Sequence, residues 1–491
     1  MSADHFDLIV IGGGPAGYVG AIRAAQLGMK VACVERGKLG GVCLNWGCIP
    51  TKALLHNAEL YQHAITHGAE WGLKTEGVEV EWDKVIGRSR KITGTLNGGI
   101  AFLFKKNKIE HIDGHATITS GKSPVAPCKV EVREAGNEYY TGEGSGTPNR
   151  TLTADKVLVC TGARPRHLPN LPHDGKVVIS SFEAMTLPEK PQKMVVVGSG
   201  AIGMEFAYFY NAFGTEVHVV EMQDHIMPIE DHDISAAAQK AFKKQGIHFH
   251  TGSTVADAQI SGSGAKCTIR KAGEESGGTE VDADVVLVAI GVEARVDGVF
   301  AENLRPEMVK GYIKTDYQEV TEPTYATSIP GVYAAGDCIG PPWLAHVASE
   351  EAAAAVERMA GHHTLGVDYE SIPGATYCNP QVASVGMSEH AVKEAGIEYK
   401  VGKYPLKGHG KAIAVGATEG LVKLLVSKKH GEILGCHICG EDASELIAEV
   451  CVAKRLEATV EDIISTVHAH PTMHEAVHEA ALAADDRLIH G

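Results

Sequence analysis

Two cysteines separated by four residues are the first side chains in the sequence that could carry out chemistry. Cys43 and Cys48 lie in the segment GGVCLNWGCIPTK, residues 40–52. A zinc site normally needs further ligands at a recognisable spacing, and none follows Cys48 nearby. A structural disulfide, two buried thiols and a working redox pair all stay open. The next residues, CIPTKALLHNAEL, are expected to form a helix, and a helix N-terminus lowers the pKa of a thiol, which favours the redox pair.

A histidine-rich segment near the end of the chain supports two interpretations. HAHPTMHEAVH, residues 468–478, contains the pattern HExxH, which on a helix places His474 and His478 on one face with Glu475 as the base of a zinc hydrolase. No convincing third metal ligand accompanies the pattern. Alternatively, Pro471 begins a helix, His470 lies at its entrance, and Glu475 is one turn further on. Such a histidine–carboxylate pair can take a proton from a thiol near neutral pH.

The elements that would position these residues begin with a dinucleotide motif. Residues 6–35 have the order strand, glycine-rich turn, helix, strand and glutamate. In this motif Gly12 permits a tight turn, Gly14 lets backbone approach a pyrophosphate, and Gly17 lets the helix pack on the strand. The phosphate would bind at the helix N-terminus, and Glu35 would accept hydrogen bonds from a ribose. This stretch therefore predicts a dinucleotide-binding fold.

The same pattern recurs in residues 193–221, with glycines at 198, 200 and 203 and an acidic residue at Glu221. A carboxylate at this position repels a 2′-phosphate, and the following MQDHIMP contains no arginine to bind one. The second motif therefore predicts NAD specificity. Two dinucleotide motifs in one chain indicate two cofactors, and the pairing that makes chemical sense is a flavin with a nicotinamide. Both motif helices are expected to end at a glycine, Gly28 and Gly214.

Composition narrows the class of protein. The 491 residues carry a net charge of −16, which argues against a nucleic-acid-binding protein. Eleven cysteines are too few for a disulfide scaffold and suit a reducing compartment. No apolar run approaches the roughly 18 residues needed to cross a bilayer. A strand-like run begins at Phe6 and leaves no room for a targeting peptide, so we expect a cytoplasmic protein.

Further patterns predict the remaining organisation. Residues 120–151 are expected to form a β-meander with an exposed loop. Buried strands are expected within residues 154–165, 283–291 and 329–338, and a separate domain of strands followed by helices after about residue 368. Cys436 and Cys439 form a CxxC within a predicted strand, where residues three apart point to opposite faces. We therefore interpret these two cysteines as small buried hydrophobic residues.

The cysteine segment and the two dinucleotide motifs together resemble the pyridine nucleotide–disulfide oxidoreductases of the glutathione reductase type. The resemblance covers essentially the whole chain, and within the family it is strongest to dihydrolipoamide dehydrogenases. VYAAGDCIGPPWLAH, residues 332–346, is similar to the second flavin motif, and HAHPTMHE to the C-terminal active-site motif. The resemblance implies catalytic roles for Cys43, Cys48, His470 and Glu475. It implies these FAD-binding residues: Gly12, Gly14, Gly17, Glu35, Lys52, Gly114, Thr161, Gly162, Asp337 and Ala345. It implies these NAD-binding residues: Gly198, Gly200, Gly203, Glu205, Glu221 and Gly291.

The resemblance also implies a reaction, the oxidation of a dihydrolipoyl group by NAD⁺. In it, His470 deprotonates a substrate thiol, the thiolate attacks Cys43, and Cys48 faces a tightly bound FAD that passes hydride to NAD⁺. The family's histidine acts on the cysteines of the other subunit, so a homodimer is expected. The expected partners are lipoyl domains of the E2 acyltransferases of 2-oxoacid dehydrogenase complexes, or the H protein of glycine cleavage. No metal is expected.

The resemblance divides the chain into four regions. We expect an FAD-binding domain at 1–164, an NAD-binding domain at 165–291, a central domain at 292–366 that completes the FAD site, and a C-terminal α+β dimerisation domain at 367–491.

The tail has no cysteine after Cys451, unlike mercuric reductases and large thioredoxin reductases. The segment AIGVEARVDG, residues 289–298, departs from the family's AIGRxPN. A docking subunit without activity is the alternative to an enzyme, and the intact cysteines and histidine–glutamate pair argue against it.

Overall fold

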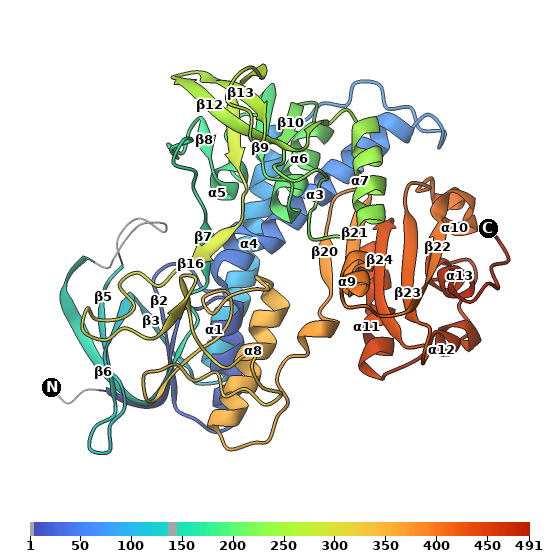
Figure 1. Cartoon of the computed structure of the whole chain (residues 1–491). Helices are drawn as coiled ribbons and strands as arrows, with labels where there is room; N and C mark the ends of the chain where they lie inside the picture. Colours follow the sequence, from blue (N-terminus) through green and yellow to red (C-terminus); the bar gives the residue numbers. More distant parts are fainter. Residues whose placement is uncertain (1–3, 136–144) are drawn as a thin grey trace. The chain divides into compact units, whose positions relative to one another are not determined.

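The computed structural model describes residues 4–135 and 145–491, and the chain divides into two compact units. Figure 1 shows the chain coloured along the sequence, from blue at the N-terminus to red at the C-terminus. The first unit contains residues up to 53, 87–166 and 292–367; the second contains 54–86, 167–291 and 368–491. Among the described residues, no helix is both long enough and apolar enough to cross a membrane.

A largely parallel sheet forms the centre of the first unit, with the strand order β3-β2-β1-β6-β5-β4 and β19 paired to β6. The strands are β1 (Asp4–Ile11), β2 (Val31–Glu35), β3 (Glu110–Asp113), β4 (His115–Ser120), β5 (Cys128–Glu134), β6 (Ser145–Val159) and β19 (Val332–Ala334). The helix α1 (Pro15–Gln26) connects the parallel neighbours β1 and β2. This is the predicted strand–turn–helix–strand unit, and Gly28 follows α1 at a φ of +89°, as the sequence predicts.

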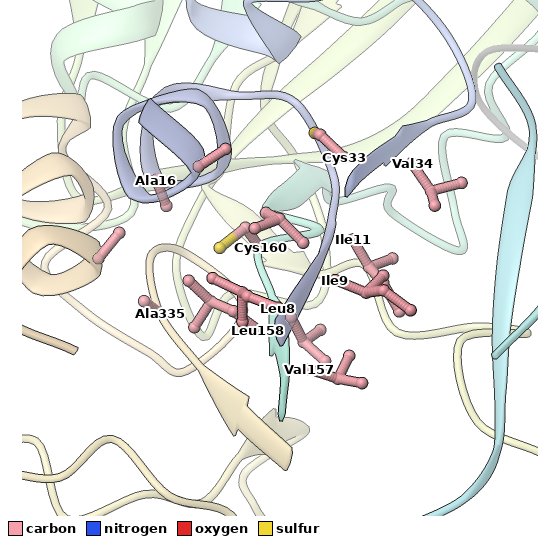
Figure 2. Packing of buried hydrophobic residues seen from close by; sticks show 14 of the residues in the cluster. Leu8, Ile9, Ile11, Ala16, Cys33, Val34, Val157, Leu158, Cys160 and Ala335 are labelled. Carbon is pink, nitrogen blue, oxygen red and sulfur yellow. The ribbon is translucent and has the colours of Figure 1, made fainter. Parts of the chain in front are cut away.

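Apolar residues of the central strands fill the core of this unit. Leu8 and Ile9 of β1 and Val157 and Leu158 of β6 are fully buried, because strands with neighbours on both sides and a covered face expose no side chain to water. Figure 2 shows these residues with Ala16 of α1. The helix α8 (Ala345–Met359) packs on α1 at Gly20, where an added Cβ would lie 3.3 Å from the Cβ of Ala352.

The predicted β-meander is confirmed where the structure describes it. β4 and β5 pair antiparallel with each other, and β5 pairs antiparallel with β6. The predicted loop includes residues 136–144, which lie outside the described residues. A short antiparallel pair, β7 (Ala163–Pro165) with β16 (Val292–Ala294), and a second one, β17 (Met308–Val309) with β18 (Tyr312–Ile313), complete the unit's strands.

The second dinucleotide fold lies in the second unit and is a five-stranded parallel sheet ordered β11-β10-β9-β15-β8. Its elements are β8 (Val178–Ile179), α5 (Ser181–Ala184), β9 (Lys193–Val197), α6 (Ala201–Ala212), β10 (Glu216–Val220), α7 (His232–Lys244), β11 (His248–His250) and β15 (Val285–Val288). Gly214 follows α6 at a φ of +90°, as predicted. The second unit also contains a separate antiparallel sheet, formed by β12 (Ser253–Ser261), β13 (Gly264–Lys271) and β14 (Thr279–Ala283).

The C-terminal part of the second unit is an antiparallel sheet ordered β20-β21-β24-β23-β22, followed by helices, which confirms the α+β prediction. Its strands are β20 (Gly374–Thr376), β21 (Gln381–Gly386), β22 (Tyr399–Pro405), β23 (Leu421–Ser427) and β24 (Ile433–Gly440). Its helices are η2 (Tyr369–Ser371), α9 (Glu389–Glu394), η3 (Leu406–Gly408), α10 (Gly410–Val415), α11 (Ala443–Arg455), α12 (Val460–Ser465) and α13 (Glu475–Ala484).

The second cysteine pair confirms the interpretation made from its spacing. Cys436 and Cys439 both lie on β24 and are fully buried. They belong to two different hydrophobic clusters, because residues three apart on a strand point to opposite faces. Both thiols therefore serve as small apolar side chains.

Candidate active site

Cys43 and Cys48 lie on two consecutive helices of the cysteine segment. Cys43 is in the middle of α2 (Gly41–Trp46), and Cys48 is the first residue of α3 (Cys48–Gln62). Gly47 ends α2, and Thr51 secures the start of α3 by donating its hydroxyl to the Gly47 carbonyl at 2.7 Å. The sequence predicted a helix from Cys48, and the structure confirms it. α3 continues into η1 (His63–His67), and α4 (Trp82–Lys106) follows.

The cysteine segment is attached directly to the first glycine-rich loop. The backbone N–H of Gly40 donates to the Gly13 carbonyl at 2.7 Å. Gly40 and Gly41 both have positive φ, and a Cβ on Gly41 would lie 2.5 Å from the Cα of Gly14, so only glycine fits there. These contacts hold the cysteine segment against the loop that would bind a cofactor's phosphates.

The buried side chain of Asn45 in α2 also fixes the cysteine segment in place. The side chain of Asn45 donates to the carbonyls of Leu39 and Gly41, and its oxygen accepts from Asn97 on α4 at 2.7 Å. The Asn45 carbonyl accepts from the Arg90 guanidinium at 2.8 Å. A buried polar side chain whose hydrogen bonds are satisfied specifies one arrangement of the groups around it. Sequence reasoning did not single out Asn45 or Arg90, since neither belongs to a recognised pattern.

The two thiols of the cysteine segment, Cys43 and Cys48, contact each other. A hydrogen bond to Cys48, together with burial and the charge of Cys48, raises the pKa of the Cys43 thiol well above its usual range, against a lowering effect of Lys52. Burial, with the charges of both cysteines, also raises the pKa of Tyr18 on α1. Lys52 is one turn after Cys48 on α3. The surroundings of Cys43 therefore disfavour its thiolate form.

The first glycine-rich motif has the backbone that a dinucleotide requires. A Cβ on Gly12 would lie 2.3 Å from the Cys160 carbonyl oxygen, and one on Gly17 would lie 1.8 Å from that of Gly12. Both positions therefore require glycine. A Cβ on Gly14 would meet only the Cα of Gly41, at 3.7 Å, so this turn presents its backbone openly. Glu35 ends β2, where its two carboxylate oxygens accept from the N–H groups of Gly13 and Gly37.

Polar groups further along the first unit fit a flavin nucleotide. The hydroxyl oxygen of Thr161 is buried and has no hydrogen-bond partner among residues 4–135 and 145–491. Burial raises the pKa of Asp337 to about 6, although part of this side chain remains accessible. A buried carboxyl of this kind is stabilised by a hydroxyl donor. The ribityl chain of FAD carries such hydroxyls, so the residues present fit the cofactor implied by the resemblance.

Three other predicted FAD residues lie on the same unit. Gly162 has a φ of +68° with open space where a side chain would be. Gly114 donates its N–H to the Glu35 carbonyl at 2.9 Å and is packed against Val132 too closely for a Cβ. Ala345 is the first residue of α8, and the first backbone N–H groups of a helix have no partner within the helix, so they can bind a ligand's oxygen atoms.

The second motif repeats the geometry of the first. A Cβ on Gly198 would lie 2.5 Å from the Ala289 carbonyl oxygen, and one on Gly203 would lie 2.0 Å from that of Gly198, whereas Gly200 has open space around it. One oxygen of Glu221 accepts from the N–H and hydroxyl of Ser199, and the other from the N–H of Gln223. Glu221 and Glu35 thus occupy equivalent positions in the two folds.

The two remaining NAD candidates also lie in the second fold or next to it. Glu205 is buried on α6, where its carboxylate accepts from the N–H of Tyr377 at 3.0 Å. Gly291 has a φ of +106° and open space at its Cβ position, which allows close approach of a ligand. The resemblance also makes Glu205 the partner of Lys52. Lys52 lies in the first unit and Glu205 in the second, so this pairing remains a prediction.

The C-terminal motif brings His470 and Glu475 together. The Nδ1 atom of His470 lies 2.8 Å from one oxygen of Glu475, and the other oxygen accepts from the N–H of Thr472 at 2.8 Å. Burial alone would raise the pKa of Glu475, but the hydrogen bonds from Thr472 and His470 outweigh it and leave the pKa below its usual range. The side chain of His470 is 79% exposed. Glu475 therefore stays ionised and orients an accessible imidazole.

The predicted start of the last helix was wrong. The sequence placed Pro471 in its first turn, but α13 begins at Glu475. The preceding residues form a turn in which Thr472 donates its hydroxyl to the Ala469 carbonyl and its N–H to Glu475. Local bonds between side chain and backbone compete with helical bonds, and here they delay the helix by one turn.

The two histidines of the HExxH pattern form hydrogen bonds to different partners. His474 bonds to one oxygen of Glu449 at 2.7 Å, and His478 bonds to the Ile464 carbonyl at 3.1 Å. The second oxygen of Glu449 contacts His468 at 2.6 Å. Glu449 of α11 thus holds residues on both sides of His470. Sequence analysis did not identify this role, because Glu449 is distant in the chain and outside any motif.

Comparison with known proteins identifies the family to which this chain belongs. A family model described as pyridine nucleotide-disulphide oxidoreductase matches residues 6–352, and the dimerisation domain of that family matches residues 372–481. The chain belongs to the pyridine nucleotide–disulphide oxidoreductase family. This confirms the resemblance seen in the motifs, and it makes the chain an NAD-dependent flavoprotein oxidoreductase with FAD and NAD(H) as cofactors.

Individual members of the family match along the whole chain. The dihydrolipoyl dehydrogenase of Rhizobium etli is 43% identical and aligns with 99% of each chain. That of Zymomonas mobilis is 42% identical over 99% of this chain and 100% of its own. The crystal structure of LpdA from Mycobacterium tuberculosis superposes with a TM-score of 0.85 at 25% identity, covering 98% of this chain and 99% of that one.

Proposed function

We propose that this oxidoreductase is a dihydrolipoyl dehydrogenase, which oxidises protein-bound dihydrolipoamide to lipoamide and reduces NAD⁺ to NADH. The observation that carries the proposal is the hydrogen-bonded pair Cys43 and Cys48 on a segment bonded to the first glycine-rich loop. The curated relatives that align end to end are named dihydrolipoyl dehydrogenase, which supports this substrate. We further propose the catalytic and cofactor-binding roles given above for each residue, and the four domains at 1–164, 165–291, 292–366 and 367–491.

The chain's own residues account for a balanced thiol–disulfide exchange. With Cys43 and Cys48 joined as a disulfide, His470 takes a proton from one substrate thiol and the thiolate attacks Cys43, so the enzyme disulfide breaks and a mixed disulfide forms. The sulfur of the second substrate thiol then attacks the substrate sulfur in the mixed disulfide, which releases the cyclic disulfide. The proton of this second thiol passes to the departing Cys43 sulfur, so Cys43 leaves as a thiol, while His470 keeps the first proton and Cys48 stays a thiolate. The substrate has lost two electrons, and the two enzyme cysteines have gained them.

The raised pKa of Cys43 supports this division of roles. After exchange, Cys43 retains its proton, because a hydrogen bond to Cys48 raises its pKa. The family resemblance assigns the thiolate beside the flavin to Cys48. When bound, FAD supplies the two-electron chemistry that restores the disulfide and delivers hydride to NAD⁺. Gly12, Gly17 and Asp337 would hold that cofactor, and Glu221 would bind the adenine ribose of NAD.

We also propose that the enzyme acts as a homodimer, in which His470 serves the cysteines of the partner subunit. The match of residues 372–481 to the family's dimerisation domain supports a dimer, and the 79% exposure of His470 is consistent with a second chain covering it. Its partners would be lipoyl domains of E2 acyltransferases or the glycine-cleavage H protein. A cytoplasmic location also stays a prediction, since the relative from Pisum sativum is named as mitochondrial.

One titration tests the reaction. The purified holoenzyme is mixed anaerobically with dihydrolipoamide and then with NAD⁺, while its visible spectrum and NADH formation are recorded. We expect a long-wavelength thiolate–flavin band followed by NADH. Cys43→Ser should retain FAD and lose turnover, whereas Cys451→Ser, a change to a half-buried cysteine on α11, should keep both. A flavoprotein that the dithiol does not reduce would contradict the proposal and favour a docking role.

A further inference from the structure

Four side chains with metal-binding atoms gather on one face of the second dinucleotide fold. Glu216 and His218 are two residues apart on β10, and His248 and His250 are two residues apart on the edge strand β11. Alternate residues of a strand share a face, and the parallel register pairs His218 with His248. The intervening Val217 and Val219 point to the opposite face and are buried in the core.

The ligand atoms of three of these residues are close enough to hold one ion. One atom each from Glu216, His218 and His248 lie within 4.8 Å of one another. The Nε2 atom of His218 is 2.9 Å from Oε1 of Glu216, and the side chain of His218 is only 13% exposed. His218 is therefore held in place by its surroundings, whereas Glu216 and His248 are exposed.

We propose that Glu216, His218 and His248 bind one divalent transition-metal ion, at a site that shares no residue with the redox reaction. Two imidazoles and one carboxylate suit Zn²⁺, Cu²⁺ or Ni²⁺, whereas Mg²⁺ and Ca²⁺ prefer oxygen ligands alone. Three protein ligands leave at least one position for water in a tetrahedral arrangement. The exposure of Glu216 and His248 gives that water and the ion access from solvent.

His250 supplies the outer contact that metal-bound histidines usually have. Its Nε2 atom lies 3.1 Å from Nδ1 of His218. If Nε2 of His218 binds the ion, its Nδ1–H donates to His250, which fixes the tautomer and orientation of the ligand.

Two features of the cluster must change when an ion enters. Lys193 lies 2.9 Å from Oε1 of Glu216, so its ammonium is displaced by the ion. The rings of His218 and His248 are stacked, with centroids 4.7 Å apart and planes 20° apart. The lone pair of a ring nitrogen lies in the plane of its ring, so two parallel rings cannot both direct a lone pair at one ion. His248 must therefore rotate about its Cβ–Cγ bond. His248 is exposed, so this rotation has space.

Zinc binding to the oxidised holoenzyme tests the site. Isothermal titration with ZnCl₂ is done in a Cys43→Ser/Cys48→Ser background, which removes the redox thiols as competing ligands. We expect one strong equivalent per chain. His218→Ala and His248→Ala should each weaken it by at least about tenfold, and His250→Ala by roughly tenfold, the effect typical of an outer contact. His430→Ala, which changes an exposed histidine in the turn between β23 and β24, is the matched control.

The zinc affinities are compared only among variants whose FAD content and circular dichroism show that they are folded. Loss of zinc affinity in His218→Ala and His248→Ala, with retention in His430→Ala, supports the site. Absence of strong zinc binding in the background protein overturns it. Equal affinity in the background protein and in both histidine variants also overturns it, because the zinc would then be bound elsewhere.

Discussion

The Nδ1 atom of His470 lies 2.8 Å from Oε1 of Glu475, at the first residue of α13. The second oxygen of Glu475 is occupied by the backbone N–H of Thr472. One carboxylate therefore fixes both the ring and the turn that carries it. The other ring nitrogen, Nε2, would act as the proton acceptor, in the arrangement used by general bases that depend on an oriented imidazole.

Glu475→Gln should reduce turnover without loss of FAD. The amide keeps the size of the side chain but no longer stabilises a protonated imidazole, so we expect kcat with dihydrolipoamide to fall by roughly 10²-fold or more. A pH profile is the informative readout, because a weaker base moves the acidic limb of kcat. Reduction of the bound flavin by NADH does not require the histidine and should be unaffected. If kcat and the profile are both unchanged, Glu475 has no role in proton transfer.

Hybrid dimers test whether His470 serves the partner subunit. Cys43→Ser and His470→Gln homodimers should each be inactive. In a hybrid of the two chains, one site combines Cys43 and Cys48 of one chain with His470 of the other, so about half of the wild-type activity should return. Co-expression with two affinity tags isolates the hybrid. An inactive hybrid with full FAD would show that each chain uses its own histidine.

Glu221→Gln should weaken NAD binding and leave reduction by dihydrolipoamide intact. A carboxylate accepts both ribose hydroxyls, and loss of a hydrogen bond to a charged group costs about 1.5–3 kcal/mol, so KM for NAD⁺ should rise about tenfold or more. Glu221 also accepts from Ser199 at 2.7 Å, so the variant's melting temperature is measured alongside. Glu216→Gln, at the far end of β10, is the control. An unchanged KM would remove Glu221 from the NAD site.

The local motifs could be predicted because their cause lies within a few residues. Cys48 opens α3 and Gly28 follows α1, as the sequence indicated. The start of α13 was missed because Glu475 bonds back to Thr472, a competition that helix preferences do not contain. Glu449 was missed because its contacts with His468 and His474 join residues 19 and 25 positions apart. Contacts between distant residues leave no periodic signal in one sequence.

A buried lysine in the second unit illustrates the same limit and leads to a stability prediction. The ammonium of Lys423 on β23 contacts carboxylates of Asp231, Asp233 and Glu389 at 2.5–2.7 Å, and its side chain is 1% exposed. Lys423→Met leaves these acids without their buried counter-charge, which typically costs about 3–5 kcal/mol. Lys403 pairs with Asp233 at 2.9 Å but is 47% exposed, so Lys403→Met should cost about 1 kcal/mol or less. Urea unfolding of both variants compares them, and equal losses would contradict a special role for Lys423.

The same cluster predicts the pH dependence of stability. Hydrogen bonds from Lys393 and Lys423 lower the pKa of Glu389 from 4.5 to about 2. Burial alone would raise the pKa values of Asp231 and Asp233, but their bonds to Lys423 outweigh it and lower both. A depressed folded pKa means that the unfolded chain binds protons first, so this stabilisation is complete above the unfolded pKa and is lost as the pH falls through the folded pKa. Unfolding free energy should therefore decline between pH 4.5 and about 2 for Glu389. The decline should be shallower in Lys423→Met, because its acids have lost the group that lowered their pKa. Equal slopes in the two proteins would assign the acid sensitivity to other carboxylates.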